Sequence, residues 1–493
     1  MKIKSSLLSL LIVSGLGFLS ACNNVSAQSV TKVTDMSWIV DVFNGIGNGA
    51  NFPKGKLVPV GTNYWFLSEQ GGVFGEGAVL SFDPSSSNIV QIGSLDNNTG
   101  RRPYGSFVIA DGKAWFTTEQ GGGGNRGTLA YVDTNTLVGP VAVFSFPTNN
   151  NPAQPNCGER PRSTPVVIGD ELWMLSAFAG SNSGGAIVKY GLISGVMTPV
   201  HQFALPSGRA PFGSLVAHSN AWYFTTHEGG ANVGSGFPNG AGTLSRLTFD
   251  GLGNPVVTKL IDMPVGNTGF PDGDVCPVGP NHLYFTTTGN SANPGALIRY
   301  DIANNSWTNL FSFTTATRTN YGSSPNGSTP IHVDGHLYFS TQTGGLNNRG
   351  VIVKYDIAKA KMTKLADLLG AGASSLGGSS IYTGGTYVDD ANNCKKIIYM
   401  LVSRGGANGI NPGLGYGTLL SINLFQPVAT LAGIAGSTQE LSWEGGYPPF
   451  TVQSTTNLEA PNWVNIASGL TTNRLSILAT NVVRYFRVSS PCP

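Results

Sequence analysis

One pattern recurs along residues 55–423 and constrains the fold more than any other feature of the chain. The first half of each copy is a short apolar triplet with an aromatic residue at its centre. The seven central aromatics are Trp65, Trp115, Trp173, Tyr223, Tyr284, Tyr338 and Tyr399. The second half starts with a Gly that precedes alternating apolar positions. These seven glycines are Gly77, Gly127, Gly185, Gly242, Gly295, Gly350 and Gly417.

Each copy divides into four short strands. In the second copy, residues 105–110 and 114–118 flank an Asp111-Gly112 hairpin turn, and residues 128–133 and 140–146 follow. Alternation with period two and frequent Gly or Asn turns favour antiparallel sheet over helix. A four-stranded sheet repeated every 50 to 60 residues, roughly, is typical of a β-propeller blade. The sequence therefore predicts an all-β, seven-bladed β-propeller over residues 36–426, with a linear β-solenoid as the competing architecture.

The predicted ring also needs a closing strand. The seventh copy lacks its outer strand, because the chain passes through Pro427 into different material. Residues 37–43 form an unpartnered strand before the first copy and are similar to the outer strand of the fifth copy, at 306–311. We therefore expect residues 37–43 to complete the seventh blade, which removes two exposed sheet edges.

The N-terminus has the pattern of an export signal. Lys2 and Lys4 precede a short apolar run, and small residues precede Cys22. Residues 1–21 are thus predicted to be a signal peptide, too short for a transmembrane helix, and 22–35 a linker. The Leu-Ser-Ala-Cys sequence resembles a bacterial lipobox, which implies lipidation of Cys22; the alternative is an ordinary signal peptide with a chance Cys. The following Asn residues suggest an outer-membrane lipoprotein, on its periplasmic side or at the cell surface.

Charge and cysteine content exclude several function classes. Only 11% of the residues are charged, and 67 are Gly, which excludes a coiled coil or a charged disordered chain. Without residues 1–21 the chain has equal numbers of basic and acidic residues, so nucleic-acid binding by bulk charge is not expected. Four cysteines remain, none in a CxxC pair, and their disulfide pairing stays open. They are Cys157, Cys276, Cys394 and Cys492.

The repeats resemble the Gly-rich tandem repeats of bacterial choice-of-anchor surface proteins of the GloVer type. The matching stretches are 334–341 with Gly344-Gly345, and Gly127-Thr128-Leu129. The resemblance implies a surface or periplasmic propeller and no established reaction. Residues 427–493 differ in pattern. They read as strands of a small β-sandwich that resembles fibronectin-like modules, and we expect a spacer or docking module there.

Five arginines lie around the loops that precede the first strand of the early copies. Each of these loops carries a Pro two residues before a small Gly or Ser, a pattern that we interpret first as structural. The arginines could hold a carboxylate, sulfate or phosphate at one rim, or simply be a solvated rim with Glu159 and Asp272 as partners. They are Arg101, Arg102, Arg160, Arg162 and Arg209.

Acidic residues and one His recur in the loops between the second and third strands. Glu69, Glu119 and the His227-Glu228 pair each precede Gly-Gly. If these loops converge, the side chains could ligate Ca²⁺ or act as acid and base on a sugar. The alternative is that Glu caps the turn through backbone N–H groups. No metal-ligand spacing is present.

Three functions are consistent with these features. The first is a lipid-anchored envelope propeller that binds a glycan or an envelope protein without turnover. The second is a propeller hydrolase or lyase that acts on an anionic polysaccharide or lactone. The third is a structural scaffold. The sequence names no catalytic residue and leaves open whether the chain is an enzyme. The repeated central aromatics are assigned to the core between blades rather than to sugar stacking.

Overall fold

The computed structural model describes residues 11–13, 28–36, 50–147, 156–266, 268–290, 294–325, 327–370, 384–390, 395–406, 415–424, 427–433, 438–457, 462–478 and 484–490. The chain divides into two units. The repeat unit consists of Lys32–Thr386 and Met400–Leu420, and the terminal unit consists of Met1–Thr31, Tyr387–Tyr399 and Ser421–Pro493. Among the described residues, no helix has the length and apolar character needed to cross a membrane.

Seven antiparallel sheets, counted over the described residues, follow the sequence repeats. Sheet 1 contains β3 (Ala50–Val60), β4 (Asn63–Gly71), β5 (Ala78–Asp83) and β6 (Asn88–Ser94). Sheet 2 contains β7 (Arg101–Pro103), β8 (Val108–Ala110), β9 (Lys113–Gln120), β10 (Thr128–Asp133) and β11 (Val141–Ser145). Sheet 3 contains β12 (Glu159–Pro161), β13 (Val166–Ile168), β14 (Glu171–Phe178), β15 (Ala186–Gly191) and β16 (Met197–Gln202). Sheet 4 contains β17 (Val216–His218), β18 (Ala221–Thr226), β19 (Thr243–Phe249) and β20 (Pro255–Asp262).

The later sheets repeat the same order. Sheet 5 contains β21 (Cys276–Val278), β22 (His282–Thr287), β23 (Ala296–Asp301) and β24 (Ser306–Ser312). Sheet 6 contains β25 (Ile331–Val333), β26 (His336–Ser340), β27 (Val351–Asp356) and β28 (Lys361–Asp367). A single turn of helix, α1 (Arg318–Tyr321), precedes sheet 6. Sheet 7 contains β29 (Thr386–Asp390), β30 (Lys395–Val402), β31 (Thr418–Asn423) and β2 (Val30–Asp35). The prediction of an all-β chain of antiparallel sheets is confirmed.

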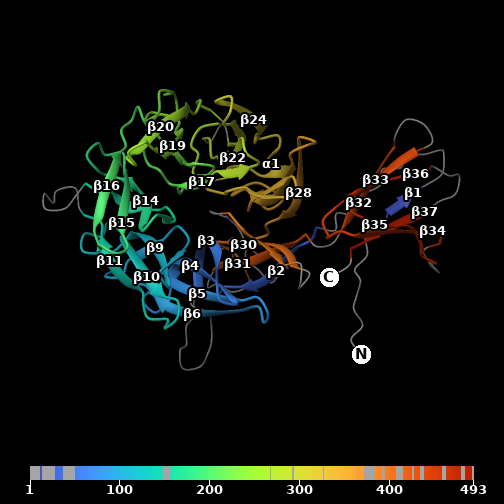
Figure 1. Cartoon of the computed structure of the whole chain (residues 1–493), viewed down its shortest axis with the longest axis horizontal. Helices are drawn as coiled ribbons and strands as arrows, with labels where there is room; N and C mark the ends of the chain where they lie inside the picture. The colour runs from blue at the N-terminus through green and yellow to red at the C-terminus, as the bar shows by residue number, and fades with distance from the viewer. Residues whose placement is uncertain are drawn as a thin grey trace. The chain divides into compact units, whose positions relative to one another are not determined.

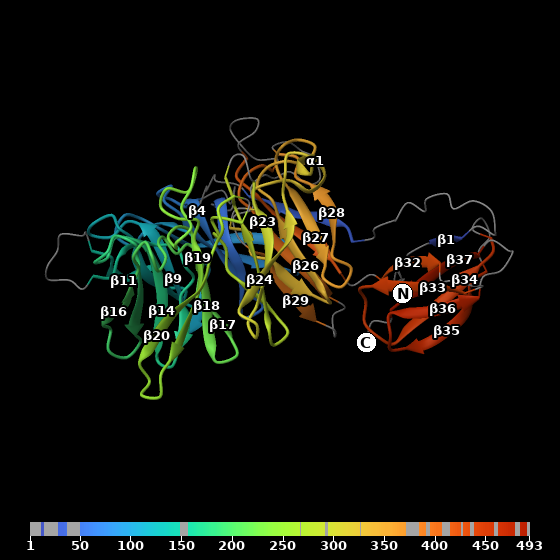
Figure 2. The same ribbon diagram turned by 90° about the horizontal axis from the view of Figure 1, so that it is seen from above.

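The sheets of the repeat unit are arranged around a common centre, with their strands side by side in each sheet (Figures 1 and 2). Their hydrophobic cores lie between neighbouring sheets. Trp65 of sheet 1, for example, belongs to one buried cluster with Phe107 and Phe116 of the second repeat. The central aromatic of every repeat is at most 7% exposed. Their predicted role in the core is therefore confirmed.

The strand that completes sheet 7 is β2, which is the outermost strand of that sheet. We predicted that residues 37–43 would take this place. An N-terminal strand does complete the sheet, but it consists of residues 30–35, so the predicted residues were wrong. Residues 37–43 lie outside the described part of the chain. The register of β2 is secured next to its end, where the Met36 N–H donates to the Gly417 carbonyl at 2.9 Å.

The terminal unit contains two further antiparallel sheets. One consists of β1 (Leu11–Val13), β37 (Arg484–Ser489), β34 (Phe450–Thr455) and β35 (Val464–Leu470). The other consists of β32 (Val428–Gly433), β33 (Thr438–Glu444) and β36 (Arg474–Leu478). Trp443 of one sheet and Phe450 and Phe486 of the other share a buried core. The edge strand β1 comes from the segment predicted to be a signal peptide.

Candidate functional site

The segment around the repeated Pro links each sheet to the preceding one by a backbone hydrogen bond. In six repeats the residue before this Pro has a positive φ between 51° and 58°: Phe52, Arg102, Arg160, Ala210, Phe270 and Ser324. Its N–H donates to a carbonyl of the preceding sheet, as Arg160 does to Arg126 at 2.7 Å. The repeated Gly of the preceding sheet faces this Pro, because a Cβ on Gly127 would lie 2.8 Å from Pro161 Cδ. The structural interpretation of the Pro pattern agrees with this geometry.

The five predicted rim arginines are not gathered in the central pocket. Arg101 is paired with Glu76 at 2.5 Å, and Arg209 is paired with Glu228 at 3.4 Å. Arg102 and Arg160 hold the positive-φ positions, where their main chains connect the sheets. These four arginines do not line the central pocket, and a ligand role for them stays a prediction. Arg162 alone of the five lines the central pocket.

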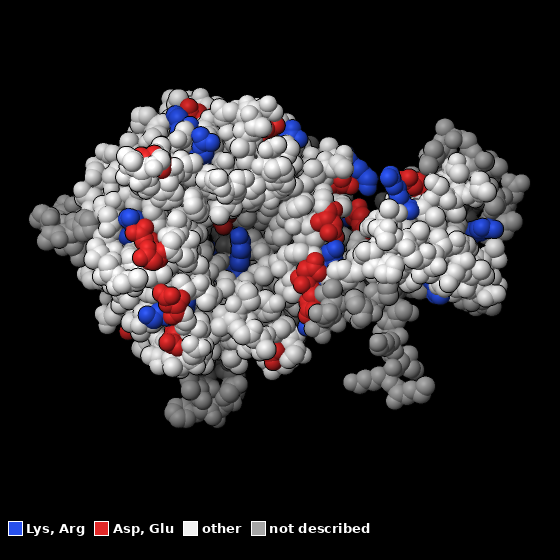
Figure 3. All heavy atoms as spheres, in the orientation of Figure 1, with Lys and Arg blue, Asp and Glu red and all other residues white. Residues whose placement is uncertain are grey.

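This pocket lies where the inner strands of the repeat unit meet, and its volume is about 200 Å³. Figure 3 shows a hollow in the middle of the unit, with basic and acidic atoms inside it. Its lining side chains form two levels in the segments that follow the repeated Pro, at the first and third residues after it, except that Thr329 is the fourth residue after Pro325. The upper level includes Tyr104, Arg162, Phe212 and Asp272, together with His227. The lower level includes Lys56, Ser106, Thr164, Ser214, Asp274 and Thr329.

Arg162 is held rigidly in the upper level. Its Nε and Nη2 donate to Oε1 of Glu119 at 3.2 and 2.6 Å. Its guanidinium carbon lies 4.9 Å from the Tyr104 ring centre and 4.5 Å from that of Phe212. The Glu119 side chain that holds it is only 6% exposed. Nη1 of Arg162 has no hydrogen-bond acceptor within the described chain. A cation with fixed orientation and a free N–H edge is suited to a carboxylate.

The Tyr104 ring lies against this guanidinium and carries a hydroxyl that is protonated at neutral pH. Burial raises the pKa of Tyr104 to about 12, although Arg162 acts against the shift. Lys54 Nζ lies 4.3 Å from the centre of the Tyr104 ring and 3.2 Å from Glu69 Oε2. The Tyr104 hydroxyl therefore stays protonated at neutral pH and can donate a proton or a hydrogen bond.

His227, which follows β18 of sheet 4, forms a hydrogen-bonded pair with Asp272, which precedes β21 of sheet 5. His227 Nδ1 contacts Asp272 Oδ1, and Thr288 Oγ1 donates to Asp272 Oδ2 at 2.6 Å. The imidazole stacks on Phe270, with ring centres 4.4 Å apart and an interplanar angle of 12°. Burial alone would lower the pKa of His227, but the charge and hydrogen bond of Asp272 outweigh it and raise the pKa. Because Nδ1 is used by Asp272, Nε2 is the nitrogen available for proton exchange.

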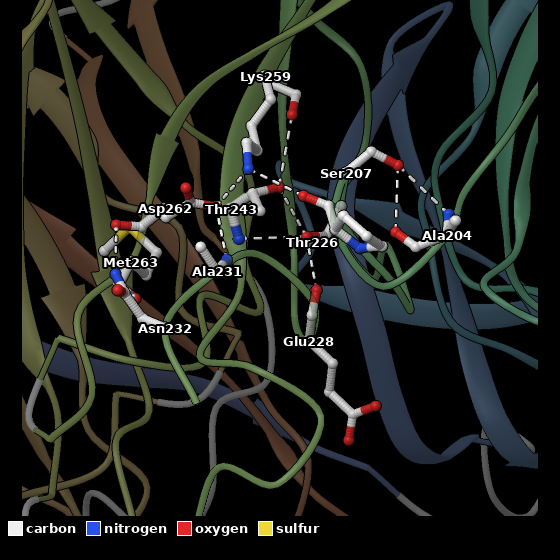
Figure 4. Close-up of polar contacts among 12 residues, drawn as sticks. Ala204, Ser207, Thr226, Glu228, Ala231, Asn232, Thr243, Lys259, Asp262 and Met263 are labelled. Atoms are coloured by element: carbon white, nitrogen blue, oxygen red, sulfur yellow. Dashed lines mark hydrogen bonds and ion pairs between the residues drawn. The ribbon is translucent and has the colours of Figure 1, made fainter. Parts of the chain in front are cut away.

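The predicted carboxylate cluster is only partly assembled. Glu69 pairs with Lys54 and Glu119 with Arg162, so neither carboxylate is the backbone turn cap that we considered. Figure 4 shows the Glu228 side chain directed away from Lys259 and Asp262, and its carboxylate pairs with Arg209 and Asn239. The predicted Ca²⁺ site is not formed by these three residues, since each carboxylate already faces a side chain that donates to it.

Several pocket residues were not identified from the sequence. Lys56, Phe212 and Asp274 were not singled out, and Asp272 was considered only as an arginine partner. Their signal was present in the repeats, because they occupy the first and third positions after the repeated Pro. Lys56 and Asp274 stand out there, because the other copies have Ser or Thr at the third position while the flanking Pro and the following Gly or Ser recur.

No family model matches the chain, and no curated protein matches it. Among solved structures, an oligogalacturonate lyase in complex with manganese has 11% identity over 84% of this chain and 96% of that chain, with a TM-score of 0.46. A puromycin-hydrolyzing peptidase of Mycobacterium tuberculosis has 12% identity over 85% and 62%, with a TM-score of 0.45. A europium-containing methanol dehydrogenase has 12% identity over 82% and 95%, with a TM-score of 0.44.

Proposed function

We propose that the protein is an enzyme of the lyase or hydrolase type that acts on an acidic sugar or its lactone in the central pocket. The observation that carries this proposal is the convergence of Arg162, Tyr104 and the His227–Asp272 pair on one cavity of about 200 Å³. That volume is below the range of drug-sized pockets and suits a ligand with a single ring. This reverses the order of the functions considered from sequence, which placed binding without turnover first.

The three groups have complementary roles in an elimination. Arg162 would hold the substrate carboxylate and stabilise the charge that grows on it when the neighbouring C–H bond breaks. His227 Nε2, in its neutral form, would take that proton, with Asp272 stabilising the resulting imidazolium. The electron pair of the C–H bond forms the C=C bond, and the leaving oxygen departs with a proton from Tyr104. In lactone hydrolysis the same His227 nitrogen would take a proton from the attacking water.

The test uses the purified full chain with oligouronates and aldonolactones, followed by ultraviolet absorbance of unsaturated product and by acid release. We expect turnover by the wild type, loss of at least about a hundredfold in kcat for His227→Gln, and a raised KM for Arg162→Met. His218→Gln is the matched control, since among the described residues His218 is hydrogen-bonded to the Pro280 carbonyl and in ring contact with Tyr223, and it does not line the pocket. Tight binding without turnover by the wild type would contradict the enzyme and support a binding protein.

We also propose that the repeat unit is a closed seven-bladed propeller. Two contacts between the last and first repeats support closure. The Phe52 N–H donates to the Tyr416 carbonyl at 3.1 Å, and Ser403 Oγ donates to the Pro53 carbonyl at 3.0 Å. Both sides of each contact lie in the repeat unit. Crystals of residues 28–424 that show an open stack of sheets would contradict this proposal.

The cellular location is a separate proposal that rests on the N-terminal sequence. We propose lipid anchoring through Cys22 in the cell envelope, with the fibronectin-like terminal module as a spacer or as a dock for an envelope partner. Mass spectrometry of the membrane-extracted protein should show a diacylglyceryl group on Cys22. A Cys22→Ser variant should then be recovered from the soluble fraction. Recovery of the wild type in that same fraction would contradict the anchor.

A further inference from the structure

The lower level of the pocket is built from a chain of hydrogen bonds that passes from sheet to sheet. The Lys56 N–H donates to Ser106 Oγ at 2.6 Å, and the Ser106 N–H donates to Thr164 Oγ1 at 2.8 Å. The series continues in the same way. The Thr164 N–H donates to Ser214 Oγ at 2.9 Å, and the Ser214 N–H donates to Asp274 Oδ1 at 2.7 Å. The Asp274 N–H donates to Thr329 Oγ1 at 3.0 Å. Each of the four hydroxyl oxygens and Oδ1 of Asp274 is therefore used as an acceptor.

Four hydroxyl protons of this level remain available. A Ser or Thr hydroxyl has one donor hydrogen besides its acceptor lone pairs. For Ser106, Thr164, Ser214 and Thr329, no acceptor of that hydrogen is present in the described chain. Ser106, Ser214 and Thr329 are at most 7% exposed, and all four residues line the cavity. Buried hydroxyl donors without a protein acceptor indicate that something in the cavity accepts them.

The charges of the lower level cancel. Lys56 Nζ lies 3.4 Å from Asp274 Oδ2, which is longer than a good hydrogen bond, and the Lys56 side chain is 38% exposed. The ammonium thus retains donor capacity toward the cavity, and Oδ2 retains acceptor capacity. A neutral surface with donors and an acceptor matches alcohol groups, which both donate and accept, better than it matches an anion, which Asp274 would repel.

We propose that this lower level is a subsite for the hydroxyl groups of a sugar ring, with Lys56 and Asp274 as its specificity-determining pair. The upper level takes the carboxylate at Arg162, a step that rests on the proposed function. The two levels are separated by two residues along the chain, with a bend between them in sheets 2 to 5, so their Cα atoms are at most about 7 Å apart. One ligand can therefore reach both levels only if it carries hydroxyls on the side of the ring away from its carboxylate. The ligand class is a monocyclic uronic acid or its terminal residue in a chain.

The test is calorimetric binding of D-glucuronate and of acetate to the full chain. Acetate can reach only the upper level, whereas glucuronate reaches both. The variant is Lys56→Met with Asp274→Asn, which keeps the net charge and keeps an amide oxygen for the Ser214 N–H. We expect glucuronate affinity to fall about tenfold or more and acetate affinity to stay unchanged. The control is Lys259→Met with Asp262→Asn, an ion pair at 2.7 Å on the outer strand β20 (Figure 4), which should change neither.

Other outcomes overturn the subsite. The subsite is contradicted if the double variant loses affinity for glucuronate and for acetate equally, or if its affinity for glucuronate is unchanged. It is also contradicted if the wild-type protein binds acetate as tightly as glucuronate. If the double variant does not fold by circular dichroism, Lys56→Gln alone should show the same selective loss. The two proposals fail separately. Glucuronate that binds through Lys56 without any turnover contradicts only the enzyme, whereas turnover with an unchanged KM in the double variant contradicts only the subsite.

Discussion

The N–H of Ser106 donates to Oγ1 of Thr164 at 2.8 Å, although 58 residues separate them in the chain. Both residues stand three positions after the repeated Pro, so they are equivalent residues of neighbouring sheets. Their bond is one member of the series that surrounds the lower level of the pocket. The same side chains that line the candidate site therefore also connect the sheets.

Loss of one hydroxyl from this series should destabilise the repeat unit. Ser106→Ala removes the acceptor of the Lys56 N–H and leaves that part-buried donor without its side-chain partner. We expect the free energy of unfolding to fall by about 1 to 3 kcal/mol, measured by urea denaturation. Ser106→Thr keeps the oxygen and should recover most of the loss. Equal stability of the wild type and Ser106→Ala would show that the series does not contribute to stability.

The contact between the repeated Gly and the next Pro can be tested at Gly127. Its φ is +100°, and an added Cβ would lie 2.2 Å from the Thr118 carbonyl oxygen and 2.8 Å from Pro161 Cδ. Gly127→Ala should lower the free energy of unfolding by about 2 kcal/mol or more, because both the backbone conformation and the contact are strained. Gly123→Ala is the control, as no atom lies within 4 Å of its added Cβ. Thermal unfolding that ranks the two variants in the reverse order would contradict this interpretation.

Stability should depend on pH through His227. Its pKa is raised in the folded protein, so the folded state binds the proton more tightly than the unfolded chain does. The resulting stability is complete below the ordinary His pKa of about 6.5 and is lost as pH rises through the higher folded value. NMR titration of the imidazole should give a folded pKa for His227 above the ordinary His value of about 6.5. Asp272→Asn should lower this pKa and flatten the pH dependence of urea unfolding above about pH 6.5. A folded pKa at or below the ordinary value would be inconsistent with the ion pair.

The described cysteines should be unreactive in the folded protein. Cys157 and Cys276 are buried free thiols, so none of the three pairings that the sequence left open for the four cysteines is formed. Burial raises the pKa of Cys157 to about 12 and that of Cys276 to about 11, so little thiolate exists at neutral pH. Alkylation followed by peptide mass spectrometry should label neither residue before unfolding and both after it. Rapid labelling of Cys157 in native protein would show that its site opens to solvent. Cys394 and Cys492 lie outside the described residues.

The candidate site was only partly predictable, because ion pairing depends on neighbours in space. From the sequence, Arg162 was one of five similar arginines and Glu119 one of three similar carboxylates. The fold pairs these two with each other at the pocket, and it pairs Arg101 with Glu76 and Arg209 with Glu228 elsewhere. The sequence also gave no reason to single out Lys56 and Asp274, which are 218 residues apart and meet across the pocket.

The sequence by itself determined the strands, the turns and the sevenfold repetition, because these follow from local alternation of apolar residues and from Gly and Pro at fixed positions. It also determined that the central aromatics are core residues, because each repeat must bury the same face. Only the tertiary structure decided which N-terminal segment pairs with β31 and which polar side chains share the pocket. The sequences of residues 30–35 and 37–43 both have the apolar alternation of a strand. Thr31 of β2 and its partner Ser421 in β31 are 390 residues apart, and this pairing depends on long-range packing that no local pattern encodes.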